Sequence, residues 1–188
     1  MTGPRPVRAP RGSQRTCKTW GAEAVMRPAE ISGDSASSES ALLHVLETLA
    51  STENYRPDGL VFLQCTSPLT TSGDIGGTIE TLLRENADTA LAVAPFHYFL
   101  WQQDASGATG INHDKSKRLL RQEREAQFVE TGAVYVMKVA GFLQHRHRFF
   151  GKTVLNPTPA EHRLEIDDPY DLLVAETALR ERAHPTPL

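Results

Sequence analysis

Residues 57–71 read PDGLVFLQCTSPLTT, and this stretch indicates the fold of the chain. A proline, an aspartate and a glycine at 57–59 are typical of a turn. The continuous apolar run at 60–63 is the pattern of a parallel strand that is buried on both faces. Ser72 is then suited to be the N-cap of a helix. The apolar face of that helix carries Ile75, Ile79, Leu82 and Leu83.

The segments on either side continue this alternation of strand and helix. Residues 88–94 predict a second buried strand, and a strand–helix–strand unit favours a parallel sheet covered by helices. Residues 133–138 predict another strand, followed by a short helix at 140–145. Upstream, serines at 35, 37 and 38 can cap a helix. The apolar face of this helix carries Leu42, Leu43, Leu46 and Leu49. We therefore expect an α/β fold over residues 21–188.

The remaining segments differ in character. Residues 97–128 are polar and contain Gly107 and Gly110, which indicates an excursion from the sheet, in the form of a hairpin arm. Pro169 is placed to begin a C-terminal helix. Residues expected to point inward from that helix are Leu172, Leu173, Ala175 and Leu179. Residues 1–20 are basic and have no acidic residue, which favours a disordered leader.

Composition excludes several classes of function. A net charge of −3 gives no reason to expect nucleic acid as a partner. No apolar run approaches the roughly 20 residues that a membrane-spanning helix needs. The two cysteines make neither a disulfide framework nor a metal knuckle. The sequence predicts a cytoplasmic protein that binds neither nucleic acid nor membrane.

The loop at 64–69 lies where the first predicted strand ends, which is where α/β sheets bind ligands. It offers the Gln64 amide, the hydroxyls of Thr66 and Ser67, and backbone N–H groups leading into a helix. These groups suit an oxygen-rich, anionic ligand. The same residues are equally compatible with a simple capped turn.

Four segments together carry a resemblance to a known family. Residues 63–69, LQCTSPL, are similar to LQPTSPLR of the acylneuraminate cytidylyltransferases, and Arg27-Pro28 with 33–38, GDSASS, is similar to their RP…GDxASS. Arg121-Gln122 with 130–135, ETGAVY, resembles RQ…ENGAxY. Residues 149–152, FFGK, with 165–172, EIDDPYDL, resemble FFGK…xIDxxxDL. The ordered likeness covers about residues 21–181.

The resemblance implies a Rossmann-like, mostly parallel sheet with flanking helices, of the nucleotide-diphospho-sugar transferase type. It also implies a reaction in which CTP and an N-acylneuraminate-type nonulosonic acid give a CMP-sugar and pyrophosphate with Mg²⁺. Enzymes of this family are typically homodimers, and residues 97–128 would be the arm that reaches the partner's sugar site. Positioning and electrostatics carry most of such a transfer.

The resemblance also implies which residues form the site. It assigns catalytic roles to Gln64, Arg121 and Asp167, contacts with the cytidine part to Arg27 and Ser38, and the metal to Asp167 and Glu165. The residues assigned to the sugar are Gln64, Thr66, Ser67, Arg121, Gln122, Thr131, Gly132, Tyr135, Phe149 and Phe150.

Structural interpretations of these residues remain open. Arg121 is among several basic residues and could belong to a solvated face. Tyr135, Phe149 and Phe150 could be ordinary core. Acidic residues at 167, 168 and 171 could cap the last helix, an interpretation that fits Asp168 best.

The sequence departs from the family in its first part. The family begins with a buried strand and a glycine-rich basic loop, PARGGSKxxxxKN, that grips the triphosphate, and no segment here matches them. Smaller departures are Cys65 for proline and Thr131 for asparagine. The alternatives are therefore a non-catalytic remnant or interaction subunit, or a transferase for a related acid such as legionaminate, pseudaminate or Kdo.

Overall fold

The computed structural model describes residues 19–33 and 35–183. Most of the predicted leader lies outside these residues, as do Cys17 and Asp34. The chain divides into two compact units: Met1–Leu60 with Met137–Gly151 (unit 1), and Val61–Val136 with Lys152–Leu188 (unit 2). Over the described ranges, no helix combines the length and hydrophobicity that crossing a bilayer requires.

Unit 1 contains the short 3-10 helix η1 (Ala29–Ile31), α2 (Ser38–Glu53) and α4 (Val139–His145). The Ser37 hydroxyl caps α2 by accepting from the Ser40 N–H, which confirms the expected start of this helix. Three of the four residues predicted for the apolar face are buried, and Leu43 is half-buried. The buried residues of α2 are Ala41, Leu42, Val45, Leu46 and Leu49. Glu39, in the first turn, pairs with Arg148 at 2.6 Å.

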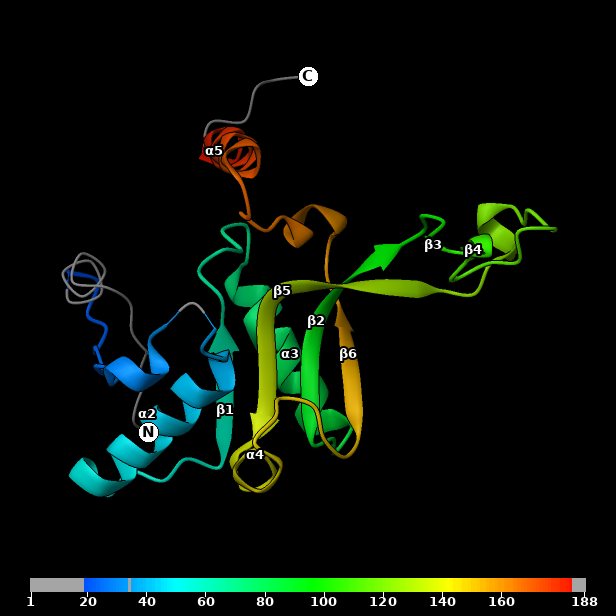
Figure 1. Ribbon diagram of the computed structural model, residues 1–188. Helices are drawn as coiled ribbons and strands as arrows, with labels where there is room; N and C mark the ends of the chain where they lie inside the picture. Colours follow the sequence, from blue (N-terminus) through cyan, green and yellow to red (C-terminus); the bar gives the residue numbers. More distant parts are fainter. Residues whose placement is uncertain (1–18, 34, 184–188) are drawn as a thin grey trace. The chain divides into compact units, whose positions relative to one another are not determined.

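Unit 2 contains most of a four-stranded sheet in the order β1–β5–β2–β6 (Figure 1). The strands are β1 (Gly59–Leu63), β2 (Thr89–Phe96), β5 (Gln127–Lys138) and β6 (Thr153–Pro157). β2 and β6 are parallel, with Thr89 opposite Thr153 and Val93 opposite Pro157. The arrows in Figure 1 show β5 running opposite to β1 and β2. The α/β fold with flanking helices is confirmed. Its sheet is mixed, because β1, β2 and β6 run in one direction and β5 runs in the other.

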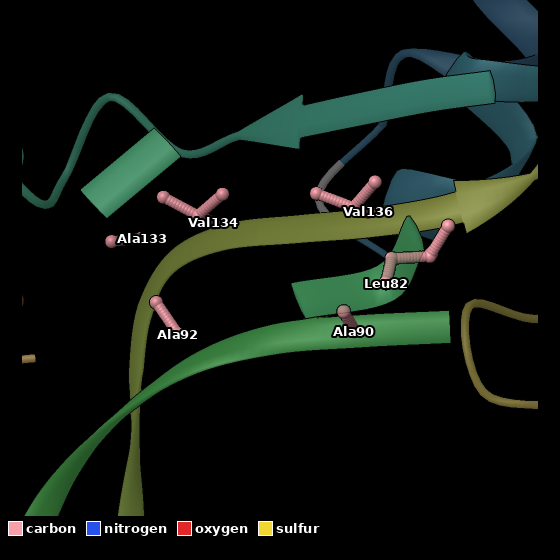
Figure 2. Packing of buried hydrophobic residues seen from close by; sticks show 6 residues of the cluster. All are labelled: Leu82, Ala90, Ala92, Ala133, Val134 and Val136. Atoms are coloured by element: carbon pink, nitrogen blue, oxygen red, sulfur yellow. The ribbon is translucent and has the colours of Figure 1, made fainter. Parts of the chain in front are cut away.

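Helix α3 (Ser72–Arg84) contacts β2 and β6. Its N-cap is Thr71, one residue before the predicted Ser72, because Thr71 and Asp74 form a reciprocal capping box. Figure 2 shows the core that Leu82 of this helix shares with β2 and β5. The other members of this cluster are Ala90, Ala92, Ala133, Val134 and Val136.

Strand β1 corrects one expectation. Its apolar run predicts burial on both faces, but Val61 and Leu63 are 38% and 47% exposed. The exposed residues alternate along the strand, so one face of β1 is poorly covered. Among the described strands, β1 also lies at one end of the sheet, beside β5 alone. The predicted strand at 88–94 is buried as expected, since β2 lies between β5 and β6.

The segment predicted as an arm contains a β-hairpin of β3 (Trp101–Asp104) and β4 (Gly107–Gly110), followed by the 3-10 helix η2 (Arg121–Glu123). The two strands pair antiparallel, with Trp101 opposite Gly110. Arg124 ties the arm to the end of β2 by donating to the His97 carbonyl at 2.7 Å. Figure 1 shows the arm extending to one side of the sheet, away from β1.

The last elements are the 3-10 helix η3 (Ala160–Arg163) and helix α5 (Pro169–Ala183), which begins at Pro169 as predicted. The expectation that its leucines point inward is wrong. Only Ala175 is buried, whereas exposed fractions reach 60% at Leu173. The polar side of α5 makes its anchoring contact instead, because Arg182 donates to the Leu69 carbonyl at 2.9 Å.

Candidate functional site

The loop after β1 is fastened to β5 by its own polar groups. The Gln64 N–H donates to the Ala133 carbonyl at 3.3 Å. Ser67 is buried, and its hydroxyl donates to the Thr131 carbonyl at 3.3 Å. Gln64 itself is half-buried. The loop therefore has a fixed course at the carboxyl end of β1, with a side-chain amide at its beginning.

The acidic segment before α5 lies against this loop (Figure 1). The Ile166 N–H donates to the Thr66 carbonyl at 2.8 Å. Glu165 and Asp167 flank Ile166 in the sequence, so the same bond fixes the backbone between the two carboxylates. This arrangement unites two segments that are a hundred residues apart in the chain.

Gly132 allows Glu165 to approach the middle of β5. A Cβ atom built on Gly132 would collide with the Glu165 carboxylate. Gly132 also has φ +65°, a left-handed conformation that side chains disfavour. The backbone angle therefore favours glycine at this position, and a side chain there would also displace the Glu165 carboxylate.

Three carboxylates influence one another here. Burial raises the pKa of Glu165, and the negative charges of Asp167 and Glu130 raise it further. Glu130 accepts a hydrogen bond from the Tyr135 hydroxyl at 2.9 Å. Tyr135 is buried and its ring stacks on Phe62 with centroids 5.8 Å apart. Sequence reasoning did not select Glu130. Its place in the ETGAVY segment, five residues before Tyr135, was the available signal.

The carboxylates of Asp168 and Asp171 form the N-terminal cap of α5, whereas that of Asp167 does not. Asp168 accepts from the N–H groups of Tyr170 and Asp171, and Asp171 accepts in return from the Asp168 N–H. Asp168 is therefore the cap residue that the sequence favoured. Asp171 also accepts from the Asp167 N–H at 3.0 Å, which leaves the exposed Asp167 carboxylate outside the cap.

Glu165 and Asp167 are the two carboxylates of this site that could hold a hard divalent cation. Across the part of the chain that the structure describes, no group of three or more His, Cys, Asp or Glu side chains is arranged to hold a metal by itself. Mg²⁺ is usually held by one or two carboxylates together with phosphates and waters, so a pair is sufficient. A cation at this place would also relieve the repulsion that raises the pKa of Glu165.

Thr131 points into the sheet. It is 1% exposed, and its hydroxyl donates to the Ala92 carbonyl at 3.1 Å. The Thr131 hydroxyl therefore hydrogen-bonds β5 to the neighbouring strand β2. Asparagine, the family residue at this position, would have to place a larger side chain in the same buried space.

Arg121 and Gln122 are not close to the other predicted sugar residues in this chain. They form η2 on the arm and are exposed. Arg121 lines a cavity at the base of the arm together with Phe96, His97 and Phe128. One chain thus brings together Gln64, Thr66, Ser67, Gly132, Tyr135, Glu165 and Asp167, and holds Arg121 and Gln122 elsewhere.

The other predicted residues belong to unit 1. Ser38 is the first residue of α2 and Arg27 precedes η1. Phe150 packs on the backbone of Gly141 and stacks on His145 with centroids 5.3 Å apart. Phe149 lies beside His147 at 5.9 Å. These contacts give both phenylalanines a packing role within their own unit.

Proteins with one common name match most of this chain. N-acylneuraminate cytidylyltransferase of Oncorhynchus mykiss is 27% identical over 169 residues, which are 87% of this chain and 37% of that protein. N-acylneuraminate cytidylyltransferase B of Danio rerio is 26% identical over 169 residues, covering 87% and 38%. N-acylneuraminate cytidylyltransferase A of Danio rerio is 27% identical over 167 residues, covering 84% and 36%.

Over most of its length, this chain is similar to N-acylneuraminate cytidylyltransferases. The resemblance inferred from the four sequence segments is confirmed. The chain spans less than two fifths of the length of these curated relatives. No family model matches it.

Substitution of Gly132 by alanine should destabilise the protein, because it adds a collision with Glu165 to the cost of a left-handed backbone. Gly21→Ala is the matched control, since Gly21 has φ +73° but open space around its Cβ position. Because the Glu165 carboxylate must move aside, we expect Gly132→Ala to lower the free energy of unfolding by about 0.5–1.5 kcal/mol more than the control. Urea unfolding of both variants measures this, and equal losses would contradict the proposed contact.

The pH dependence of stability should reveal the raised pKa of Glu165. The folded protein holds the Glu165 proton more tightly than the unfolded chain, so stability falls as pH rises between the unfolded and folded pKa values. Without divalent cations, Glu165→Gln should therefore stabilise the protein at neutral pH, and the gain should shrink as pH approaches 4.5. Urea unfolding across pH checks this. Glu161→Gln, on an exposed side chain of the same segment, controls for loss of a charge.

Proposed function

We propose that this chain is a cytidylyltransferase that joins CMP to an N-acylneuraminate-type nonulosonic acid. The anomeric hydroxyl oxygen of the acid forms a bond to the α-phosphorus of CTP. The bond from that phosphorus to the bridging oxygen breaks, and pyrophosphate leaves with the electron pair. The hydroxyl proton passes to solvent. The names of the relatives support this reaction class.

The observation that carries the proposal is the closeness of the acidic segment to the strand-end loop. The Ile166–Thr66 hydrogen bond and the packing of Glu165 on Gly132 join two segments that each resemble a different functional segment of the family. A simple capped turn at 64–69 would not require a second, acidic segment beside it. The arrangement therefore favours a binding loop.

We assign the side chains as follows. The Gln64 amide offers both a donor and an acceptor to the hydroxyls of the sugar. Glu165 and Asp167 hold Mg²⁺, which when bound neutralises charge on the phosphates of CTP. Arg27 and Ser38, in unit 1, are assigned to the cytidine part of the nucleotide on the resemblance of their segment.

The place of Arg121 supports a homodimer in which each arm serves the partner's site. Arg121 could grip the carboxylate of the acid in bidentate fashion, but it lies in η2 on the arm, where it lines a cavity with Phe96 and Phe128. The arm exposes large apolar side chains suited to a protein interface. They include Tyr98, Leu100, Trp101, Ile111 and Leu120.

Asp167→Asn should abolish most of the transfer, since it removes one of the two proposed cation ligands. We expect kcat/KM for pyrophosphate release from CTP, Mg²⁺ and N-acetylneuraminate to fall at least about a hundredfold, or roughly 3 kcal/mol. Asp168→Asn is the matched control, because asparagine is also a good N-cap and should preserve both α5 and activity.

The same assay separates the alternative functions. Release of pyrophosphate with legionaminate, pseudaminate or Kdo, but not with N-acetylneuraminate, would identify a transferase for a related acid. No release with any of these acids, from a folded protein that still binds one of them, would identify a non-catalytic relative.

Mixed dimers should regain activity if the arm is shared between chains. Asp167→Asn and Arg121→Ala chains, co-expressed with different affinity tags, form a mixed dimer in which one site receives both intact residues. We expect about half of the wild-type activity per dimer, because one of two symmetric sites is restored. The two homodimers serve as controls. A mixed dimer as inactive as they are, or a monomeric protein, would refute the shared arm.

A further inference from the structure

His162 of η3 is anchored to the beginning of α3 through a largely buried contact. Its Nδ1 lies 3.1 Å from Oδ1 and 2.9 Å from Oδ2 of Asp74. The side chains of His162 and Asp74 are only 12% and 8% exposed. Sequence reasoning found no role for His162, because its partner lies 88 positions away in the chain.

The chemistry of Asp74 determines the direction of this hydrogen bond. Burial opposes ionisation of Asp74, but the N–H and hydroxyl of Thr71, together with His162, lower its pKa below the ordinary value. An ionised carboxylate only accepts hydrogen bonds. His162 must therefore carry a proton on Nδ1 and donate it. One carboxylate thus holds both the cap of α3, through Thr71, and the ring of His162.

The chain on either side of His162 is also fastened. Upstream, Thr158 donates to the Val93 carbonyl through its N–H at 2.7 Å and its hydroxyl at 3.1 Å. Downstream, the Arg163 guanidinium lies 5.6 Å from the centroid of the Tyr98 ring. Ile166, between the two site carboxylates, then bonds to Thr66. His162 is the buried side-chain anchor that precedes this last bond.

We propose that His162 is a positioning residue, which through Asp74 holds the turn before Glu165 and Asp167 and so fixes these carboxylates against the loop at 64–71. The proposal rests on the proposed function of that site. The contact between His162 and Asp74 then helps to fix the loop at both of its ends. Asp74 fixes Thr71 at its end, while the turn held by His162 leads to the bond at Thr66, near its beginning.

The test compares His162→Leu with His162→Asn in the full chain. Leucine removes the donor, whereas the asparagine amide can donate from the position of Nδ1. Two measurements do not depend on turnover: hydrogen exchange of the peptide containing the Ile166 amide, and the affinity for Mn²⁺ followed by electron paramagnetic resonance. The Mg²⁺ concentration needed for half-maximal pyrophosphate release is the third measurement.

We expect leucine to speed exchange at Ile166, to weaken Mn²⁺ binding by about 10- to 100-fold, and to raise the Mg²⁺ concentration for half-maximal release by a similar factor. Asparagine should restore all three. Unchanged exchange and Mn²⁺ affinity in the leucine variant would overturn the proposal. Absence of turnover in the wild type, with the expected changes in exchange and Mn²⁺ affinity, would instead refute only the proposed function.

A second variant keeps the test decisive if the leucine variant does not fold. His162→Gln is polar and similar in size to histidine, but its amide reaches the position of Nε2 and not that of Nδ1. It should therefore fold and still behave like the leucine variant. Exchange and Mn²⁺ affinity equal to those of the asparagine variant would show that the donor position is irrelevant, which contradicts the proposal.

Discussion

The contact between Glu165 and the backbone of Gly132 constrains the whole site. The carboxylate occupies the space beside a glycine in the middle of β5, where the backbone adopts φ +65°. Because Gly132 is flanked by the buried residues Thr131 and Ala133, the position is fixed by the core of the sheet. The acidic segment therefore inherits its location from strand packing, and a carboxylate is held where burial and neighbouring charge both oppose its ionisation.

Elements with a local cause were predictable from the sequence. Ser37 caps α2, Pro169 begins α5 and Asp168 caps that helix, because each of these features depends on neighbours a few residues away. Sheet order depends on long-range pairing. An antiparallel β5 between β1 and β2 leaves β1 at the end of the sheet, so its apolar run could not reveal its exposure. The apolar residues of α5 predicted an inward-facing side, but whether that side is covered also depends on distant segments.

The candidate site was predictable in part. The motifs containing Gln64, Glu165 and Asp167 lie in two segments that the structure brings into contact. They could not tell that the Thr131 hydroxyl serves the sheet, that Arg121 lies on the arm, or that His162 meets Asp74. Each of these facts depends on which distant segment packs against the residue, and a single sequence does not carry that information.

The position of β1 has a consequence for handling the protein. Its five residues, GLVFL, contain no charge and no proline, and two of their apolar side chains are exposed. A strand of this composition at the end of a sheet presents backbone N–H and C=O groups that can template another strand. Among the described strands, edge-to-edge pairing of β1 is therefore an aggregation hazard, and a lysine on its solvent-facing side would reduce it.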